Sequence, residues 1–418
     1  MFMTVTDGTR TVKRGEFIGI LAMTMSVAAL AIDLMLPALS DIREEFGLAS
    51  DSTAVAGLVT TFMLGLAMAQ IAYGVLSDRV GRKPMIFLGL VLYAVGAIGS
   101  ALAPNLGWLL GARFVWGLGA AGPRVITMSV IRDTYVGDQM ARAMSFVFAT
   151  FILVPVVAPS LGALLTEWIS WRGAFGFCVI VAVLVALLVL RLPETLRPEN
   201  RMRLTWRDIT AAGRKVVTTR VTIGYTFAIT AMFGVFFSYL ASSELIFDEV
   251  FGLGDEFPVV FGAIAVVMGL AMYTNGRIVV RAGLSRLVRI AMIGYVGVTA
   301  VLASLAWLTD GQPGFWPYAL ILSASLVMHA LLVPNMNAIA MVPMGEIAGT
   351  ASAVIGTVST AIGALIGSVI DRAYDGSVLP LSMAFLATGL VALAISRWAG
   401  ATVKEPVSIE PRPVYPVE

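Results

Sequence analysis

Three charged residues lie inside long apolar runs, where electrostatic interactions are not weakened by water and a charged group can have an unusual protonation behaviour. Asp33 lies in the first such run, and Arg113 and Arg124 lie in the fourth. An ionised carboxylate is costly in hydrocarbon, so Asp33 must either pair with a cation or take up a proton. A group that changes charge with its exposure is what proton coupling needs. The alternative is a structural aspartate near the membrane surface, because Pro37 follows only one turn later.

The two arginines keep their protons at any physiological pH, so each needs a carboxylate, a carbonyl or water as a partner. Eleven residues separate them. That spacing is about 20° past three helical turns, so both side chains project from nearly the same helix face. Arg113 could be a structural hydrogen-bond donor that holds helices together. Arg124 could line a cavity near Asp33 or contact an anionic substrate.

Several more polar residues in apolar runs give weaker signals. Asn335 and Asn337, in the tenth run, are candidates for the polar lining of a substrate cavity. His329 is the only histidine, and a single histidine on an apolar face is more often a hydrogen-bonded core residue than a proton carrier. Glu244 is expected to be a solvated charge at the outer end of its run. With one histidine and one cysteine, a His/Cys metal site or a disulfide framework is not expected, and neither is a cofactor.

Membrane-spanning helices must position these candidates. The chain has 418 residues, of which 58% are hydrophobic and 13% charged, whereas soluble domains carry about 25% charged residues. Lipid must therefore face much of the surface. The net charge of +2 gives no argument for nucleic acid, and nothing suggests an enzyme. Apolar runs of about 20 residues, the length of a spanning helix, predict twelve spans, near 17–39, 53–75, 84–103, 107–129, 142–166, 172–191, 220–242, 257–279, 286–308, 316–341, 348–370 and 379–399.

A polar segment divides these runs into two groups of six, as in transporters built from two repeats. Residues 192–219 are rich in Arg, Pro and Lys. We therefore predict an N-terminal six-helix bundle over 1–191, a central cytoplasmic loop over 192–219, and a C-terminal six-helix bundle with a short cytoplasmic tail over 220–418.

The basic residues predict the orientation. Most of the 28 Lys and Arg residues fall in the two tails and in alternate loops, whereas only Arg43, Arg172 and Arg372 fall in the loops of the opposite side. The positive-inside rule then places both termini in the cytoplasm. The first run continues past residues 29–31, which resemble a leader cleavage site, so we expect a span there and not a cleaved leader.

One charged loop separates the second and third runs. Residues 74–83 read Gly-Val-Leu-Ser-Asp-Arg-Val-Gly-Arg-Lys, and a bilayer accepts such a loop only at its surface. A weak echo of this loop follows the eighth run, which indicates an internal duplication. The matched residues are Gly74, Arg79 and Gly81 in the first half and Gly276, Arg281 and Gly283 in the second.

This loop resembles the signature loop of the major facilitator superfamily, and further motifs narrow the resemblance. They are Asp33-Leu-Met-Leu-Pro37, Arg113-Phe-Val-Trp-Gly117-Leu-Gly119, Arg132-Asp133, Val154-Pro155-Val-Val-Ala158-Pro159-Ser-Leu-Gly162, Trp171-Arg172, Pro334-Asn335-x-Asn337 and Ala348-Gly349-Thr350-Ala351. Together they are similar to the bicyclomycin/chloramphenicol-resistance (Bcr/CflA) branch of the twelve-span drug:proton antiporters. The chain departs from the wider superfamily in the fifth span, where Ala158 and Ala163 replace the usual glycines.

The resemblance implies an all-α membrane protein with the major facilitator fold, twelve transmembrane helices in two six-helix bundles. It implies proton coupling by Asp33 and Arg113. It also implies a conformational latch, in which Asp78 caps the eleventh span and Arg82 pairs with Asp133, and an antiporter helix that packs against the second bundle. The latch residues are Gly74, Asp78, Arg79, Gly81, Arg82 and Asp133, and those of the antiporter helix are Pro155, Pro159 and Gly162.

We therefore expect a monomeric transporter in a bacterial inner membrane, which exports small, largely apolar or cationic drug-like compounds by alternating access. Its partners would be a small-molecule substrate, protons and the lipid bilayer, with no nucleic acid, and its energy source would be the proton gradient. The sequence leaves three more functions open. They are a dedicated exporter of one endogenous metabolite, a facilitator or importer of a sugar or organic acid, and a receptor-like membrane protein without transport.

Overall fold

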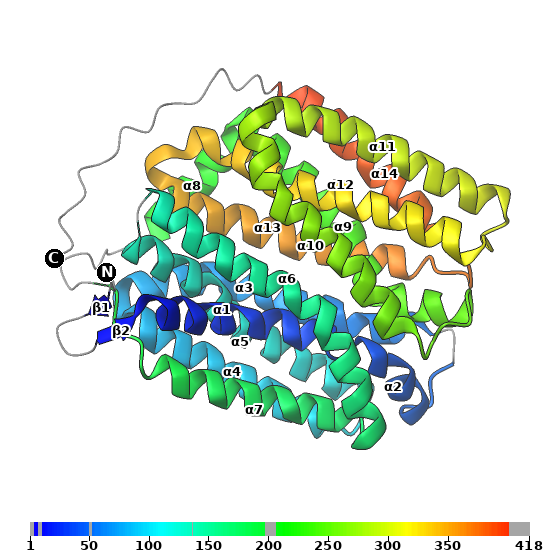
Figure 1. The fold of residues 1–418 in the computed structure, drawn as a ribbon, viewed down its shortest axis with the longest axis horizontal. Helices are drawn as coiled ribbons and strands as arrows, with labels where there is room; N and C mark the ends of the chain where they lie inside the picture. Colours follow the sequence, from blue (N-terminus) through cyan, green and yellow to red (C-terminus); the bar gives the residue numbers. More distant parts are fainter. Residues whose placement is uncertain (1–3, 7–10, 50–51, 136, 197–205, 401–418) are drawn as a thin grey trace.

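The computed structural model describes residues 4–6, 11–49, 52–135, 137–196 and 206–400, although some side chains within its helices are not described. A short antiparallel hairpin precedes the first helix and pairs Val5 with Val12. Its strands are β1 (Thr4–Thr6) and β2 (Thr11–Lys13). Figure 1 shows the helices arranged as two bundles side by side, with the hairpin and α8 (Trp206–Thr218) at the same end.

The first bundle contains the helices that precede α8. They are α1 (Arg14–Asp33), α2 (Leu39–Glu45), α3 (Gly57–Val80), α4 (Arg82–Ala101), α5 (Leu106–Thr134), α6 (Gly137–Trp168) and α7 (Trp171–Val189), with short 3₁₀ turns η1 (Leu36–Ala38) and η2 (Thr53–Ala56). The second bundle contains α9 (Arg220–Glu249), α10 (Phe257–Ala282), α11 (Leu284–Leu308), α12 (Phe315–Met341), the 3₁₀ turn η4 (Val342–Ile347), α13 (Ala348–Asp371) and α14 (Leu379–Ala399).

Each predicted span coincides with one helix, except for the first, which covers α1, η1 and the start of α2, and the second, which begins in η2 and continues in α3. Within the described residues, eleven helices are long and apolar enough to cross a membrane. The helix α6 covers the fifth predicted span. Most of α2 lies beyond the first predicted span. The helix α8 was not predicted either, since it lies inside the segment that the sequence analysis treats as a loop. That helix is amphipathic and short, so its apolar residues do not form the continuous run that reveals a span.

Glycines at matched positions separate neighbouring helices in the two bundles. Gly81 ends α3 with φ of 123°, and Gly283 ends α10 with φ of 78°. Both conformations are unfavourable for a residue with a Cβ. The correspondence of these two turns supports the internal duplication that the sequence indicates.

Small residues allow the helices of the first bundle to approach closely. A Cβ on Gly117 of α5 would lie 2.0 Å from the Phe62 carbonyl oxygen of α3, and one on Gly119 would lie 2.1 Å from the Tyr93 nitrogen of α4. Contacts of this kind are the usual way that helices associate in lipid, where no hydrophobic effect drives them together. The bundle interior is completed by Trp116, whose ring packs edge-on against Tyr93.

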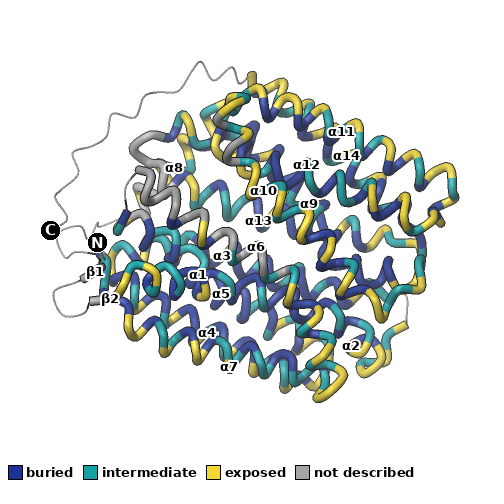
Figure 2. The backbone as a smooth tube through the Cα atoms, viewed as in Figure 1, coloured by how far each residue is buried: buried dark blue, intermediate teal, exposed yellow. Residues whose placement is uncertain are grey.

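Apolar side chains cover much of the outer surface. Figure 2 shows exposed residues along the outward sides of α4, α7 and α11, and on α7 they include Ile180, Val183, Leu184 and Leu187. A water-soluble protein would not leave such continuous apolar strips uncovered. We infer that these faces contact lipid, as the composition predicts.

Candidate functional site

Asp33 is the last residue of α1, where the helix breaks before η1. It is only 4% exposed, and within the described part of the chain it makes no hydrogen bond or ion pair. Its electrostatic neighbour in the second bundle is Tyr239 of α9. The structure therefore buries a carboxylate without a cation partner at the place where the first bundle meets the second.

Tyr239, the neighbour of Asp33, belongs to a cluster of aromatic side chains in the second bundle. The ring of Tyr239 stacks on Phe261 of α10 with 5.8 Å between centroids, and it lies 6.3 Å from the ring of Phe236. Phe236 in turn stacks on His329 of α12 at 5.1 Å. These rings, from three helices, form a mostly buried and largely apolar cluster, and Tyr239 is the member that lies beside the carboxylate. Flat apolar surfaces of this kind suit aromatic and apolar ligands.

Arg113 does not contact Asp33. Its Nη1 donates to the Ala31 carbonyl at 2.8 Å and its Nε to the Leu58 carbonyl at 3.3 Å. The guanidinium also lies over the rings of Phe62 and Trp116, at 4.6 and 4.8 Å from their centroids. Arg113 therefore holds α1, α3 and α5 together, as the structural alternative predicts. The Ala31 carbonyl that it binds lies two residues before Asp33.

Arg124 has a different environment, although it projects from the same helix. It is partly exposed, and the described residues provide it with no hydrogen bond or ion pair. A guanidinium without a protein partner is available to water or to an anionic group of a ligand. The structure therefore separates the two arginines into a structural one near Asp33 and an uncompensated one further along α5.

The charged loop forms a network around the buried guanidinium of Arg82. Arg82 pairs with Asp78 at 2.5 Å and with Asp133 of α5 at 2.8 Å, and it also donates to the Ser77 hydroxyl at 2.7 Å. The first two backbone N–H groups of α4 bind the Glu194 carboxylate at 3.0 Å each. Glu194, which the sequence analysis missed, thus caps α4, where the helix dipole favours an anion.

The predicted cap of the eleventh span by Asp78 cannot be compared with the structure in full, because the side chains of residues 345–350 lie outside the described ones. Two glycines of the loop differ in their surroundings. A Cβ at Gly81 would lie 2.8 Å from the Glu194 carboxylate, whereas one at Gly74 would meet open space. Arg79 is exposed. The role of the network as a latch stays a prediction.

The helix that carries the two predicted prolines contacts both bundles. Gly162 of α6 lies against α1 of its own bundle, since a Cβ there would be 2.0 Å from the Leu34 carbonyl oxygen. This glycine thus allows the close helix packing that the sequence analysis expects, within its own bundle. The contact with the second bundle comes from Val156, whose carbonyl oxygen lies 3.0 Å from the Cβ position of Gly262 in α10. Pro159 is buried, and the side chain of Pro155 lies outside the described residues.

The two asparagines of α12 also have different surroundings. Asn335 is buried and donates to the Asn275 side chain of α10 at 2.7 Å and to the Leu331 carbonyl at 2.7 Å, so it bonds two helices of the second bundle to each other. Asn337 is exposed. His329 is buried among aromatic rings, and its Nδ1 has no partner among the described residues.

A buried ion pair joins the ends of the two bundles that lie away from the N-terminal hairpin and α8. Arg43 of α2 pairs with Glu244 of α9, and their side chains are only 6% and 4% exposed. The expectation that Glu244 is a solvated charge was wrong. The partners lie far apart in the sequence, and the sequence offers no signal that would pair them. Nearby, Asp371 at the end of α13 accepts a hydrogen bond from Ser238 of α9 at 2.6 Å.

Comparison with known proteins identifies the family. The model of the Major Facilitator Superfamily matches residues 21–368. The chain is 30% identical over 357 residues to a bicyclomycin resistance protein homolog of Haemophilus influenzae, covering 84% of this chain and 87% of that one. It is 27% identical over 374 residues to a chloramphenicol resistance protein of Pseudomonas aeruginosa, covering 87% of each chain.

Solved structures agree on the fold. A D-xylose-proton symporter superimposes with a TM-score of 0.73 at 15% identity, over 92% of this chain and 97% of that one. A human organic anion transporter superimposes with a TM-score of 0.62 at 20% identity, over 92% and 97%. The predicted fold and the resemblance to the bicyclomycin and chloramphenicol resistance branch are both confirmed. This chain belongs to the Major Facilitator Superfamily of membrane transporters.

Proposed function

We propose that this chain exports small, largely apolar or cationic compounds in exchange for protons. The observation that carries the proposal is Asp33, a buried carboxylate without a cation partner among the described residues, placed between the two bundles beside Tyr239. In hydrocarbon such a group is stable only when it is protonated or hydrated. It can therefore bind a proton in one state of the transporter and release it in another.

The substrate class rests on two observations. The aromatic side chains of Phe236, Tyr239 and Phe261 offer an apolar surface next to a group that is negative once deprotonated. A flat cation would be attracted to both features. The relatives named for bicyclomycin and chloramphenicol resistance add support by their similarity along nearly the whole chain.

Alternating access requires the outer ends of the bundles to separate. In this structure they are joined by the Arg43–Glu244 pair, so we infer that the outer end is closed. Opening toward the outside must break this pair and hydrate both charges. The energy would come from the proton gradient, since 100 mV supplies about 2.3 kcal/mol per charge moved, enough for about fifty-fold accumulation of a neutral substrate.

The proposal includes the membrane arrangement predicted from the sequence: a monomer in a bacterial inner membrane, with both termini in the cytoplasm. The N-terminal bundle is assigned to residues 1–191, the central segment to 192–219 and the C-terminal bundle to 220–418. No cofactor is required, because the proton gradient drives the cycle.

A dedicated exporter of an endogenous anion is a second candidate, favoured by the partly exposed and unpaired Arg124. One experiment separates the two candidates. Purified protein is reconstituted in liposomes with an acidic interior, and apolar, cationic and anionic compounds are screened for substrate-induced proton release. Release with apolar or cationic compounds, lost in Asp33→Asn and kept in Arg124→Gln, supports drug export. Release with anions alone, lost in Arg124→Gln, supports the second candidate. No release with any class contradicts both.

A further inference from the structure

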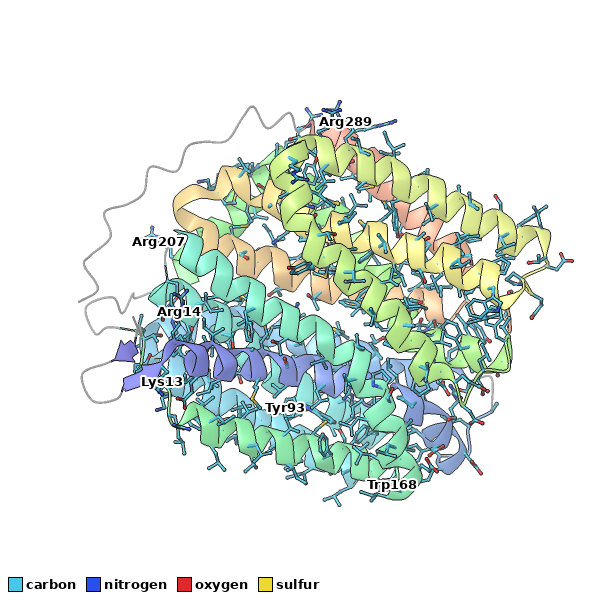
Figure 3. The ribbon with its side chains drawn as sticks, viewed as in Figure 1. Lys13, Arg14, Tyr93, Trp168, Arg207 and Arg289 are labelled. Atoms are coloured by element: carbon cyan, nitrogen blue, oxygen red, sulfur yellow. The ribbon has the colours of Figure 1, made fainter. Side chains whose placement is uncertain are left out.

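The arginines at the central-segment end of the C-terminal bundle have no carboxylate partner among the described residues. We define an arginine rim by Arg220 of α9, Arg286 and Arg289 of α11, and Arg397 and Trp398 of α14. All five are exposed, and the described residues provide no carboxylate within ion-pair distance of any of the four arginines. Figure 3 shows Arg289 at the corner of this bundle, where it points away from the helices.

Several cations at the same end of the N-terminal bundle have partners inside the protein. Arg82 binds Asp78 and Asp133, and Arg191 binds Glu16 at 2.8 Å. Lys83 donates to two backbone carbonyls, and Arg14 lies over the ring of Tyr135 at 5.3 Å. Arg82 and Arg191 thus pair with carboxylates, whereas none of the rim arginines pairs with a carboxylate of the described residues. The rim therefore differs from its counterpart in charge balance, although both lie at the same end of the molecule.

The position of the rim residues on their helices increases the difference. Arg220 opens α9, and Arg286 and Arg289 lie in the first turns of α11. The first turn of a helix already carries a partial positive charge, which favours anions and disfavours cations. Three arginines at two helix N-termini thus concentrate positive potential, and no carboxylate of the described residues balances it. Such a site is stabilised by an anion from outside the chain.

Trp398 indicates where that anion would come from. Its side chain is 54% exposed, and Arg220 lies over its ring at 5.1 Å while donating to its backbone carbonyl. A tryptophan at the end of a membrane-spanning helix is typical of the headgroup level of a bilayer. The arginines beside it would therefore lie among lipid phosphates.

We propose that the arginine rim binds the headgroups of anionic phospholipids. The helices α9, α11 and α14 pack against one another, so one or two headgroups could bridge their ends. The exposed cations Arg214 and Lys215 of α8 extend the positive surface. The proposal depends on the membrane-spanning arrangement but not on the transported substrate or on proton coupling.

The test uses the fluorescence of Trp398 in the full-length protein. The protein is placed in nanodiscs that contain either brominated phosphatidylglycerol or brominated phosphatidylcholine at the same mole fraction. Trp398 is isolated as the difference between the unchanged protein and Trp398→Phe. We expect stronger quenching by the anionic lipid, and this preference should decline as salt is raised, because salt screens exposed charges.

Two matched single variants identify the source of the preference. Arg289→Gln removes a rim charge without touching Trp398, and it should lower the preference about five-fold. Arg372→Gln removes an exposed arginine at the opposite end of the bundle and should leave it unchanged. Equal quenching by the two lipids in the unchanged protein would overturn the proposal, and so would equal effects of the two variants. In either case the rim would serve only as an orientation signal.

Discussion

The two bundles follow the same chain path, but they keep their charges in different places. The N-terminal bundle buries Asp33, Arg113 and Arg82 in its interior. The C-terminal bundle places the ring of Tyr239 beside Asp33, and four of its arginines lie on the rim. Its buried carboxylates, Glu244 and Asp371, lie at the ends of their helices and each has a partner. Among these three carboxylates, Asp33 of the N-terminal bundle is the one that is buried without a partner among the described residues.

The repeated loops show how this difference arose in the sequence. Gly81 and Gly283 occupy matched turns, so the backbone is retained. At the positions that match Asp78 and Arg82, however, the second half has Val280 and Leu284. Both halves therefore have the glycine that the turn of the backbone requires. Only the first half has the residues of the charged network. We infer that the N-terminal bundle carries the proton-dependent step and that the C-terminal bundle provides apolar contacts and membrane anchoring.

The largest effect is expected at Asp33. Asp33→Asn keeps the size of the side chain but cannot bind and release a proton, so uphill efflux should be lost completely. Substrate binding should survive. In the unchanged protein, affinity should fall as pH falls, because proton and substrate compete for the same carboxylate; in the variant it should be independent of pH. Asp33→Glu should retain partial coupling. The measurement is substrate-driven proton release in liposomes, with binding followed from pH 5 to 9.

The matched control is Asp371→Asn, which removes a buried carboxylate from the other bundle. That residue already has a hydrogen bond from Ser238, so coupling should persist in this variant. The reverse result, with Asp33→Asn still pumping and Asp371→Asn inactive, would assign coupling to the C-terminal bundle.

The next largest effect is expected at the contact between the bundles. Glu244→Gln removes one charge of a buried pair, and such losses cost about 3–5 kcal/mol because the remaining charge is uncompensated. The closed outer end should lose that stabilisation and open more often. The measurement is the distance between spin labels at Glu44→Cys and Asp248→Cys, both exposed positions, in a Cys178→Ala background.

A charge swap provides the control for this pair. Arg43→Glu combined with Glu244→Arg keeps opposite charges at the contact and should restore part of the closed population. An unchanged distance distribution in Glu244→Gln would show that the pair does not hold the outer end closed.

A smaller effect is expected beside Asp33. Gly162→Ala places a Cβ 2.0 Å from the Leu34 carbonyl oxygen, so the backbone of α1 or α6 must shift, at about 1–3 kcal/mol. Gly176→Ala on α7 meets open space and should be neutral. Thermal unfolding in detergent measures both. Equal stability of the two variants would mean that α6 and α1 are less closely packed than the structure indicates.

The sequence predicted the spans and the fold because each span is a continuous apolar run and the loop motif is specific. It also located Asp33, since a carboxylate in an apolar run is conspicuous. It could not predict the partners of Glu244, Asn335 or Glu194. Those contacts join segments distant in the chain, and no local pattern records which helix faces another. The helix α8 was missed for a different reason, since it lies on the bundle surface and has no continuous apolar run.

The smallest effect is expected in the charged loop, at Asp78. Arg82 binds three groups, so Asp78→Asn removes one partner and leaves Asp133 at 2.8 Å and Ser77 at 2.7 Å. A partly exposed ion pair is worth about 1 kcal/mol or less, so the unfolding temperature should change little. If the loop also acts as a latch, transport should fall while the amount of folded protein in the membrane stays constant.

The double variant decides whether the network acts as one unit. Once Asp78 and Asp133 are both replaced by Asn, the buried guanidinium of Arg82 has no carboxylate among its described partners, and its burial becomes costly. The loss of stability should therefore exceed the sum of the two single losses, as expected for residues that share a partner. Replacing Val280 by Asp in the second half is the converse test. Without an arginine at position 284 it should add no stability, because the C-terminal bundle has lost the cation that the carboxylate would bind. Two results would contradict this view of the network as a difference between the bundles. One is a gain of stability in Val280→Asp, and the other is strict additivity of the stability losses in the N-terminal loop.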